Sequence, residues 1–247
     1  MDELDVLLGK TRLLNQMVQR QSDQPPDFKE LASILSGLTA SHVYIIEKKG
    51  NVLGSCNYPG IGQPMVGSRV LDEHILTEEY LEWLSSFFET GVSCQVGPDT
   101  LLTIIPLYGG PNRLGTVVLA KSEEFTTQEV IVAEVGATVI GLAILRDLND
   151  QAERINRKKD AVAQALAVLS YSEVEAVKYI FKELDGDEGF VVAIRLADKY
   201  MLTRSVIVNA LRKLESAGVI QARSLGMKGT YIKVLNEFLH EQLAGIE

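Results

Sequence analysis

A long helical pattern divides the chain. Thr126-x-x-Glu129 is a capping-box pattern, in which the threonine oxygen accepts from an amide of the first turn and the glutamate reaches back to the N-cap amide. Helical spacing then continues to Leu169. The apolar part, Val130 to Leu145, has sixteen residues and contains Glu134, short of the ~18–20 uncharged residues of a membrane helix. We expect a buried core helix here and no contact with a membrane.

The later part of this pattern is highly charged yet keeps an apolar stripe. Nine of the fifteen residues from Arg146 to Asp160 are charged. The stripe alternates spacings of three and four, as a coiled-coil seam does, and consists of Leu145, Leu148, Ala152, Ile155, Lys159, Val162, Leu166 and Leu169. Two interpretations stay open: a dimeric coiled coil, and a connecting helix that lies on its own domain.

Charge differs on the two sides of this helix. The chain has 247 residues, enough for two domains of ordinary size, and a net charge of −9. Residues 1–150 hold 10 Lys and Arg against 20 Asp and Glu, whereas residues 151–247 hold 14 against 13. Positions 203–233 alone carry six basic residues and one acidic residue. One basic stretch in an acidic chain indicates a local contact with a polyanion.

The residues before Thr126 predict an α+β domain. Three helices are expected here. One covers the first twenty residues, one runs from an N-cap at Asp27 to a stop at Gly37, and one lies near 71–88. Helices around an antiparallel meander are typical of α+β proteins. The expected strands are 42–46, 51–55, 101–107 and 113–120, with a loop over 57–67.

The last third predicts a winged helix-turn-helix. Ser172-x-x-Glu175 is a second capping-box pattern, and the helix that it opens should stop near Asp185. Two more helices follow, and then two short strands, 219–223 and 229–234, which form the wing. We therefore expect three parts, which are a first domain over 1–145, a helical linker over 146–169 and a DNA-binding domain over 170–247.

The helix expected from Thr203 to Ala217 has a polar face of unusual composition. Its apolar side holds Ile207, Ala210, Leu211 and Leu214, and its other side holds Ser205, Val208, Asn209 and Arg212. Arginine binds guanine in bidentate fashion, asparagine binds adenine, and aliphatic carbon contacts the thymine methyl group, so this face suits the major groove. An ordinary solvated helix face is the alternative. The residues placed for phosphates are Arg204, Lys213, Arg223 and Lys228.

Motifs of enzymes and of metal or nucleotide sites do not appear. His42, His74 and His240 are isolated, and neither of the two cysteines neighbours a histidine in sequence. Gly9-Lys10-Thr11 ends like a phosphate-binding loop, but the position five residues earlier is Leu4 and the segment predicts a helix. We expect no catalytic residue, no metal and no bound cofactor. Few cysteines and no leader pattern at the start favour a cytoplasmic protein.

Two runs in the last third resemble the CodY family of global transcriptional repressors. They are TRSVIVNALRKLESAGVI, from Thr203 to Ile220, and RSLGMKGTYIKVL, from Arg223 to Leu235. Looser similarity covers the rest of the chain, at residues 8–12, 113–116, 136–141, 169–173 and 183–186.

The resemblance implies a dimeric bacterial repressor of nutrient-response genes with an amino-terminal GAF-type sensor. Such a sensor binds isoleucine or another branched-chain amino acid, and GTP is a second effector in some members. A long helix joins it to the domain that binds double-stranded DNA. Carried over by motif, the DNA contacts are Ala193, Arg204, Ser205 and Asn209.

The chain departs from the family pattern at several positions. Ile194-Arg195 replaces the usual residues after Ala193, and Met201 stands where the family has a glycine. A bulky residue there does not easily adopt a positive φ, so we expect the turn between the helices to be built differently. The segment after the sensor's Thr77-Glu-Glu-Tyr80 motif is shorter than usual.

The resemblance also implies a ligand pocket. Arg69 suits the ligand carboxylate because its guanidinium bonds a carboxylate in bidentate fashion. The other expected pocket residues are Leu76, Tyr80, Thr103 and Pro106. Two alternatives to an amino-acid-controlled repressor remain, namely a winged-helix regulator whose sensor has lost or changed its ligand, and a GAF-type nucleotide-signalling module whose winged helix contacts proteins.

Overall fold

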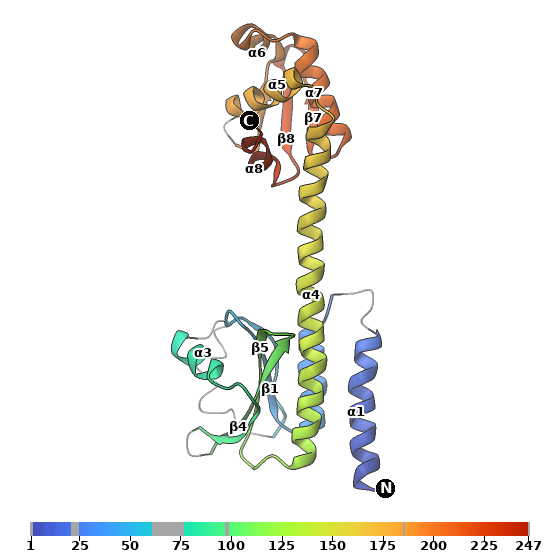
Figure 1. The fold of residues 1–247 in the computed structure, drawn as a ribbon, viewed down its shortest axis with the longest axis vertical. Helices are drawn as coiled ribbons and strands as arrows, with labels where there is room; N and C mark the ends of the chain where they lie inside the picture. The colour runs from blue at the N-terminus through green and yellow to red at the C-terminus, as the bar shows by residue number, and fades with distance from the viewer. Residues whose placement is uncertain (1, 21–24, 61–76, 97–98, 185, 247) are drawn as a thin grey trace. The chain divides into compact units, whose positions relative to one another are not determined.

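The computed structural model describes residues 2–20, 25–60, 77–96, 99–184 and 186–246 (Figure 1). The chain divides into two compact units, Met1–Asn149 and Asp150–Glu247. The division falls inside the segment 146–169 that is expected as a linker. Each unit has an apolar core of its own, and each is therefore described by itself.

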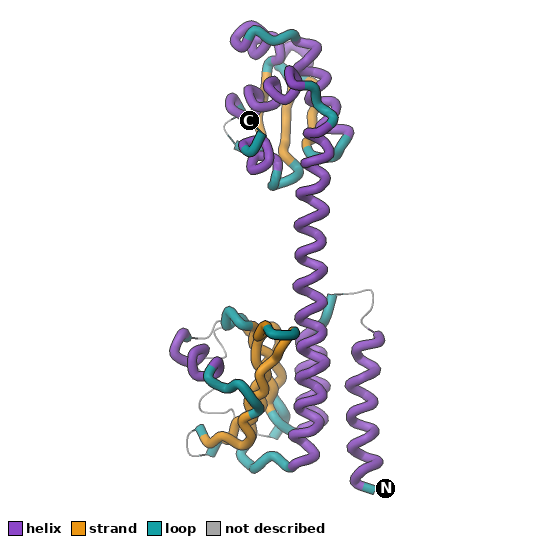
Figure 2. Tube along the Cα trace, in the orientation of Figure 1, coloured by secondary structure: helices purple, strands orange, loops and turns teal. Residues whose placement is uncertain are grey.

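The first unit is built on a five-stranded antiparallel sheet (Figure 2). The order of the strands is β2-β1-β5-β4-β3, so that β5 lies at the centre between β1 and β4. The four expected strands are confirmed, and β3 is an additional strand that the pattern did not predict. The bounds are β1 His42–Glu47, β2 Val52–Cys56, β3 Gly91–Gln95, β4 Leu101–Gly109 and β5 Asn112–Lys121.

Helices cover both faces of this sheet (Figure 1). Helices α1 (Glu3–Arg20), α2 (Phe28–Thr39) and the first half of α4 (Thr127–Ala167) pack with one face in the larger core. Helix α3 (Glu78–Ser85) covers the opposite face with a smaller core, which includes Tyr44, Leu84, Leu102 and Ile104. The observed architecture is α+β, as the pattern predicts.

Two helix bounds differ from the expected ones. Helix α2 begins at the expected N-cap, Asp27, but passes through Gly37 and ends at Ala40, which adopts a left-handed conformation with φ +49°. The expected stop at Gly37 is therefore wrong, because a lone glycine weakens a helix without ending it. The described part of the helix expected near 71–88 is α3, and residues 71–76 lie outside the described residues.

Helix α4 runs for 41 residues. Its capping box is confirmed, since Thr126 Oγ1 accepts from Glu129 N–H and a Glu129 carboxylate oxygen accepts from Thr126 N–H. In the expected seam, Leu148 and Ile155 are 47% and 46% exposed, whereas Val162 is buried in the second core. Among the described helices, α4 alone is long and apolar enough to cross a membrane, and half of that apolar window is buried within the chain.

The second unit has the winged helix-turn-helix order that the sequence predicts. Its core joins the helices to a three-stranded sheet of order β6-β8-β7, in which β6 is the strand that the pattern missed. The end of α4 contributes Val162, Ala165 and Leu166 to this core. The bounds are α5 Tyr171–Glu183, β6 Glu188–Val191, α6 Ala193–Tyr200, α7 Arg204–Ser216, β7 Ile220–Ser224, β8 Thr230–Val234 and α8 Leu239–Ala244.

The capping box of α5 lies two residues earlier than expected. Ser170 is the N-cap residue, and its side chain and backbone exchange hydrogen bonds with Glu173. Glu175, which the pattern paired with Ser172, forms an ion pair with Lys178 instead. Two overlapping Ser-x-x-Glu patterns compete in this segment, and the prediction selected the wrong one.

Candidate nucleic-acid interface and ligand pocket

Helix α7 separates an apolar face from a polar one. Thr203 caps its start, because Thr203 Oγ1 accepts a hydrogen bond from Val206 N–H at 3.4 Å. The four apolar residues expected inside, Ile207, Ala210, Leu211 and Leu214, are buried in the second core. The expected burial of this face is confirmed. The residues of the helix that remain exposed are Arg204, Ser205, Val208, Asn209 and Arg212, followed by Glu215 and Ser216 in the last turn.

The exposed face of α7 contains an open recess of about 540 Å³, lined by Arg204, Ser205, Val208 and Asn209. Val208 is 46% exposed and supplies aliphatic surface beside the polar groups. Ser205 Oγ lies 3.1 Å from Thr203 Oγ1, which holds the serine hydroxyl at the first turn of the helix. Donors, acceptors and methyl groups side by side are what the base edges of a major groove require.

The basic side chains around this face fall into two classes. Within the part of the chain that the structure describes, Arg204, Arg212, Arg223 and Lys228 form no ion pair. An exposed cation without a protein partner keeps its full charge for a phosphate. Lys213 belongs to the other class: its Nζ lies 2.7 Å from Glu173 Oε2 and 3.1 Å from the Val168 carbonyl oxygen.

The turn between α6 and α7 corrects an expectation. Met201 adopts the left-handed conformation with φ +53°, although it is not a glycine. Its amide donates to the Ala197 carbonyl group, and its side chain is 97% exposed, so no neighbour clashes with it. The turn therefore keeps its geometry at a local cost of about 1–2 kcal/mol. Ala193 lies half-buried at the first position of α6, where it is expected to meet DNA.

The wing is a hairpin whose glycines are required by the backbone. Gly226 and Gly229 adopt φ values of +63° and +100°, which side chains rarely allow. A Cβ at Gly229 would also lie 2.5 Å from the Val191 carbonyl oxygen of the neighbouring strand. The glycines thus serve the turn itself, and the hairpin presents Arg223 and Lys228 as exposed cations.

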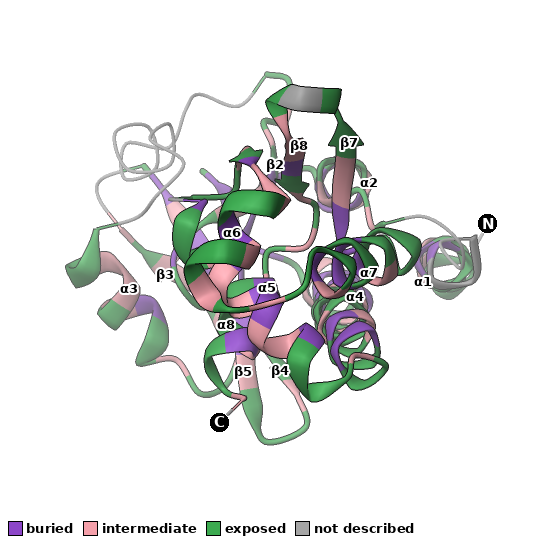
Figure 3. Cartoon of the chain, turned by 90° about the horizontal axis from the view of Figure 1, so that it is seen from above, coloured by how far each residue is buried: buried purple, intermediate pink, exposed green. Residues whose placement is uncertain are grey.

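Helix α3 and the sheet beneath it form the candidate ligand face of the first unit. Tyr80 is half-buried there and packs beside Trp83, with ring centroids 5.3 Å apart. Burial, and to a smaller extent Tyr44, raises the pKa of Tyr80 to about 12, so its hydroxyl remains a hydrogen-bond donor at neutral pH. Along α3, Leu84 is buried, Tyr80, Leu81 and Trp83 are half-buried, and the other residues are exposed (Figure 3).

Of the other expected pocket residues, the two that the structure describes, Thr103 and Pro106, do not share a face with Tyr80. Thr103 is completely buried, and its hydroxyl oxygen accepts from the Ser93 amide at 3.3 Å. It lies between Leu102 and Ile104, which face α3, so the alternation of the strand turns Thr103 to the other face. Pro106 lines a separate recess of about 410 Å³ beside α4. Arg69 and Leu76 lie outside the described residues.

Arg113 is a residue whose role the sequence pattern did not reveal. Its guanidinium extends from β5 to the end of α3 and donates to the Leu84, Ser85 and Phe87 carbonyl oxygens at 2.8, 3.2 and 2.7 Å. A fourth hydrogen bond, of 2.9 Å, goes to the Thr116 hydroxyl oxygen. A cation at a helix C-terminus satisfies carbonyl groups that have no partner in the helix. Arg113 therefore fixes α3 on the sheet.

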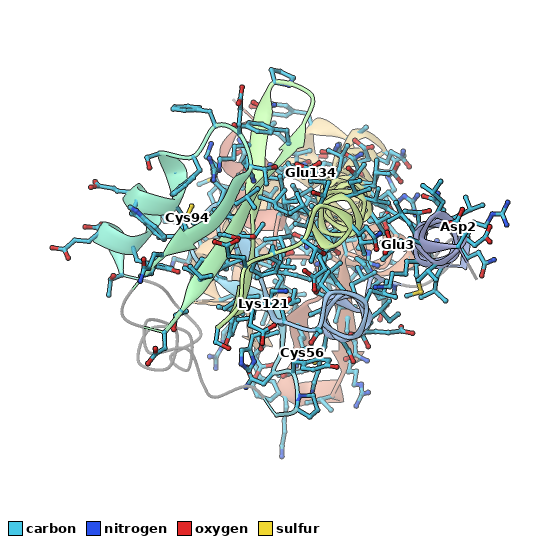
Figure 4. All side chains as sticks on the ribbon, turned by 90° about the horizontal axis from the view of Figure 1, so that it is seen from below. Asp2, Glu3, Cys56, Cys94, Lys121 and Glu134 are labelled. Atoms are coloured by element: carbon cyan, nitrogen blue, oxygen red, sulfur yellow. The ribbon has the colours of Figure 1, made fainter. Side chains whose placement is uncertain are left out.

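The described residues hold no cluster of three or more metal-ligating side chains. His42 Nδ1 accepts from the Tyr58 amide, and His240 Nε2 lies 3.1 Å from Asp187 Oδ1, so both have structural partners. Cys56 and Cys94 are free and belong to the two edge strands of the sheet (Figure 4).

Comparison with known proteins assigns both units. The family description "CodY GAF-like domain" matches residues 6–168, and "CodY helix-turn-helix domain" matches residues 187–246. A global transcriptional regulator CodY from Clostridium botulinum (strain Okra) is 47% identical over 256 residues, covering 98% of this chain and 99% of that protein. Another from Thermoanaerobacter sp. (strain X514) is 47% identical over 249 residues, covering 97% and 98%.

Among solved structures, the chain is similar to the cofactor-binding GAF domain of the nutrient sensor CodY from Clostridium difficile. It is 26% identical, with a TM-score of 0.41, and covers 58% of this chain and 99% of its own. The relatives in sequence cover almost the full chain, and one family matches both the GAF-like domain and the helix-turn-helix domain. The chain belongs to the CodY family of global transcriptional regulators.

Proposed function

We propose that this chain represses nutrient-response genes by binding operator DNA, with an affinity that a small effector controls. The observation that carries the proposal is the polar face of α7, where the exposed Arg204, Ser205, Asn209 and Arg212 surround the exposed Val208. Neither arginine has an ionic partner among the described residues. A helix that only buried an apolar stripe would need no such combination of base-reading groups.

Each part of this interface has a distinct role in the proposal. Asn209, Ser205, Arg212 and Val208 meet base edges, and Arg204, Arg223 and Lys228 meet phosphates. Ala193, at the start of α6, approaches the DNA backbone. The proposal places the chain in the cytoplasm. It acts there as a homodimer, because two recognition helices match two half-sites of an operator. Exposed apolar residues of α1 and of α4, such as Leu8 and Leu148, supply surface for the dimer.

The effector in this proposal is isoleucine or another branched-chain amino acid, bound by the first unit. Tyr80, Leu102 and Ile104 give the α3 face an apolar floor with one phenol donor. The proposal assigns the ligand carboxylate to Arg69 and an apolar ligand contact to Leu76, and Thr103 and Pro106 support the floor of the pocket through β4. The effector controls binding only if it prefers the DNA-competent state of the protein over the other state.

GTP is the second effector to be tested. Lys10, in the segment that ends like a phosphate-binding loop, lies on α1, and its ammonium donates to the Leu38 carbonyl oxygen at 2.7 Å. This lysine is therefore engaged within the protein, and the proposal places no phosphate on it.

The experiment starts from a random-sequence duplex library selected on the full chain with isoleucine present. Fluorescence anisotropy then measures binding of the enriched duplex and of a shuffled duplex, with no addition, with isoleucine, valine or leucine, and with GTP. We expect preference for the enriched duplex and tighter binding with a branched-chain amino acid. Equal binding of both duplexes contradicts the DNA-reading proposal. Specific binding that no amino acid changes contradicts the effector proposal and favours a regulator whose sensor has lost or changed its ligand.

A further inference from the structure

Lys213 differs from the other cations of α7 in being bound on two sides by the protein. Its ammonium donates to Glu173 Oε2 at 2.7 Å and to the Val168 carbonyl oxygen at 3.1 Å. The lysine side chain is 41% exposed, whereas that of Glu173 is 8% exposed. The ion pair thus has one buried end and one end at the surface, and it ties the recognition helix to the chain just beyond the end of α4.

The carboxylate that holds Lys213 also holds the start of α5. Glu173 Oε2 accepts from the Ser170 amide at 2.7 Å, and Ser170 Oγ accepts from the Glu173 amide at 3.4 Å. The hydrogen bond from Lys213, followed by the one from the Ser170 backbone, lowers the pKa of Glu173. Glu173 Oε2 therefore joins the start of α5 to α7, and the Lys213 ammonium adds Val168, the residue that follows α4.

The position of Lys213 along α7 determines what this attachment controls. Lys213 follows Asn209 by four residues, so both side chains lie on nearly the same side of the helix. The apolar contacts of Ile207, Ala210, Leu211 and Leu214 seat the helix on the core, and they are not directional. A charged hydrogen bond with fixed geometry at Lys213 adds the directional restraint that sets the rotation of α7 about its axis.

We propose that Lys213 is a positioning residue that acts through Glu173, and that it makes no phosphate contact. The inference rests on the proposed binding of DNA by α7. Through Glu173 and Val168, Lys213 links the end of the long helix α4 to the orientation of Ser205 and Asn209. A change at the end of α4 then reaches the base-reading face through one ion pair.

Glu173→Gln separates this proposal from a phosphate role by the sign of its effect. Capping boxes accept glutamine in place of glutamate, so the variant keeps the start of α5 and removes only the charge opposite Lys213. If Lys213 positions α7, Glu173→Gln weakens binding to the enriched duplex by roughly three- to tenfold. If Lys213 bound phosphate, removal of the competing carboxylate would leave affinity unchanged or increase it.

Lys213→Gln and the double variant complete the cycle. We expect Lys213→Gln to weaken binding as much as Glu173→Gln does, and the double variant to be no weaker than either one. The slope of log affinity against log salt should not change, whereas the matched control Arg204→Gln should reduce it by about 0.9. Additive losses, or a slope reduced by about 0.9 in Lys213→Gln, overturn the proposal.

Hydrogen exchange of the free protein gives a second readout that needs no DNA. Glu173→Gln and Lys213→Gln should both accelerate exchange of the amides near the end of α7, and Arg204→Gln should not. Unchanged exchange in the first two variants overturns the positioning role. A wild-type chain that binds no DNA contradicts the proposed function alone, because the exchange measurement still decides whether the ion pair holds α7.

Discussion

The proposed recognition face of α7 and the proposed ligand face under α3 are built in different ways. All exposed groups of the first come from one helix, between Arg204 and Arg212, and the periodicity of that helix places them side by side. The second draws on β1, on α3 and on the β4–β5 hairpin, which are three separate segments of the chain. A site on one helix follows from spacing, whereas an assembled site depends on strand order and register.

A second comparison concerns two similar clusters, one in each unit. In the first unit, Lys121 Nζ lies 2.8 Å from Glu129, the glutamate of the α4 capping box (Figure 4 labels Lys121). In the second unit, Lys213 pairs with Glu173 of the α5 capping box. Lys121 belongs to β5 and lies eight positions before Glu129, whereas Lys213 belongs to α7 and lies 40 positions after Glu173, so each cluster fixes a helix start to another element. The chain uses the same device to seat a core helix and to seat the recognition helix.

The largest expected effect separates the two cores. A Cβ at Gly115 would lie 2.2 Å from the Ile46 carbonyl oxygen in the neighbouring strand. Gly115→Ala should therefore destabilise the first unit by about 3 kcal/mol or more. The second unit, whose core is separate, should unfold as in the wild type. Calorimetric unfolding of the full chain measures both transitions.

Gly37→Ala is the matched control for Gly115→Ala. Apart from the backbone of α2 itself, no atom of the described residues lies within 4 Å of a Cβ built at Gly37, and the residue is inside α2. This substitution should stabilise the first unit by up to about 1 kcal/mol, because alanine favours a helix over glycine. If both transitions move together in Gly115→Ala, the two units do not unfold separately and the comparison fails.

The next effect concerns the recognition face. Arg204→Ala should weaken binding to selected and random duplexes alike, because a phosphate contact carries no sequence information. Asn209→Ala should weaken binding to the selected duplex by about 1–3 kcal/mol and binding to random DNA much less. Anisotropy titrations at one salt concentration provide both values. Arg157→Ala is the control, since this exposed arginine pairs with Glu153 on α4 and should not affect binding.

The ligand face provides a smaller effect with a built-in probe. The chain contains one tryptophan, Trp83, and it lies on α3. Arg113→Ala removes the hydrogen bonds to the end of α3 and should loosen its packing by about 1–2 kcal/mol. Acrylamide should then quench Trp83 fluorescence more strongly, with emission at longer wavelength. Arg113→Lys keeps the charge but loses the planar guanidinium that donates several hydrogen bonds at once, and should give an intermediate result. Unchanged quenching in Arg113→Ala contradicts the claim that Arg113 fixes α3 on the sheet.

The smallest expected effect is on pH dependence. Burial raises the pKa of Glu129, but hydrogen bonds from Lys121 and Thr126 outweigh burial, so the net effect lowers this pKa. Hydrogen bonds from Lys213 and Ser170 lower the pKa of Glu173. A lowered folded-state pKa gives stability that is complete above the ordinary value of 4.5 and is lost as the pH falls through the folded value. Urea unfolding at neutral and acidic pH should show Glu129→Gln and Glu173→Gln differing from wild type only at neutral pH. A difference that persists in acid would contradict the pairing.

The same contrast explains which features the sequence could predict. The capping box at Thr126 and the buried stripe of α7 depend on local spacing, and both predictions are confirmed. Strands β3 and β6 were missed because they are short and irregular: β3 contains a register shift and Ser93 with φ +50°, and β6 has four residues.

Other features depend on tertiary contacts that no local pattern contains. The choice between Ser170 and Ser172 as N-cap coincides with Lys213, 40 positions from Glu173, binding that glutamate. The hydrogen bond from Arg113 to Leu84 joins β5 to α3 across 29 positions. The left-handed Met201 is possible because its side chain is exposed, which the sequence does not state.

The most direct measurement of the central claim is base preference at single positions. Binding of the full chain and of Asn209→Ala is measured on the enriched duplex and on duplexes that each replace one base pair. We predict that the wild type discriminates strongly at one adenine-containing pair in each half-site and that Asn209→Ala loses discrimination there alone. A variant that weakens every duplex by the same factor would contradict the claim that the exposed face of α7 reads DNA sequence.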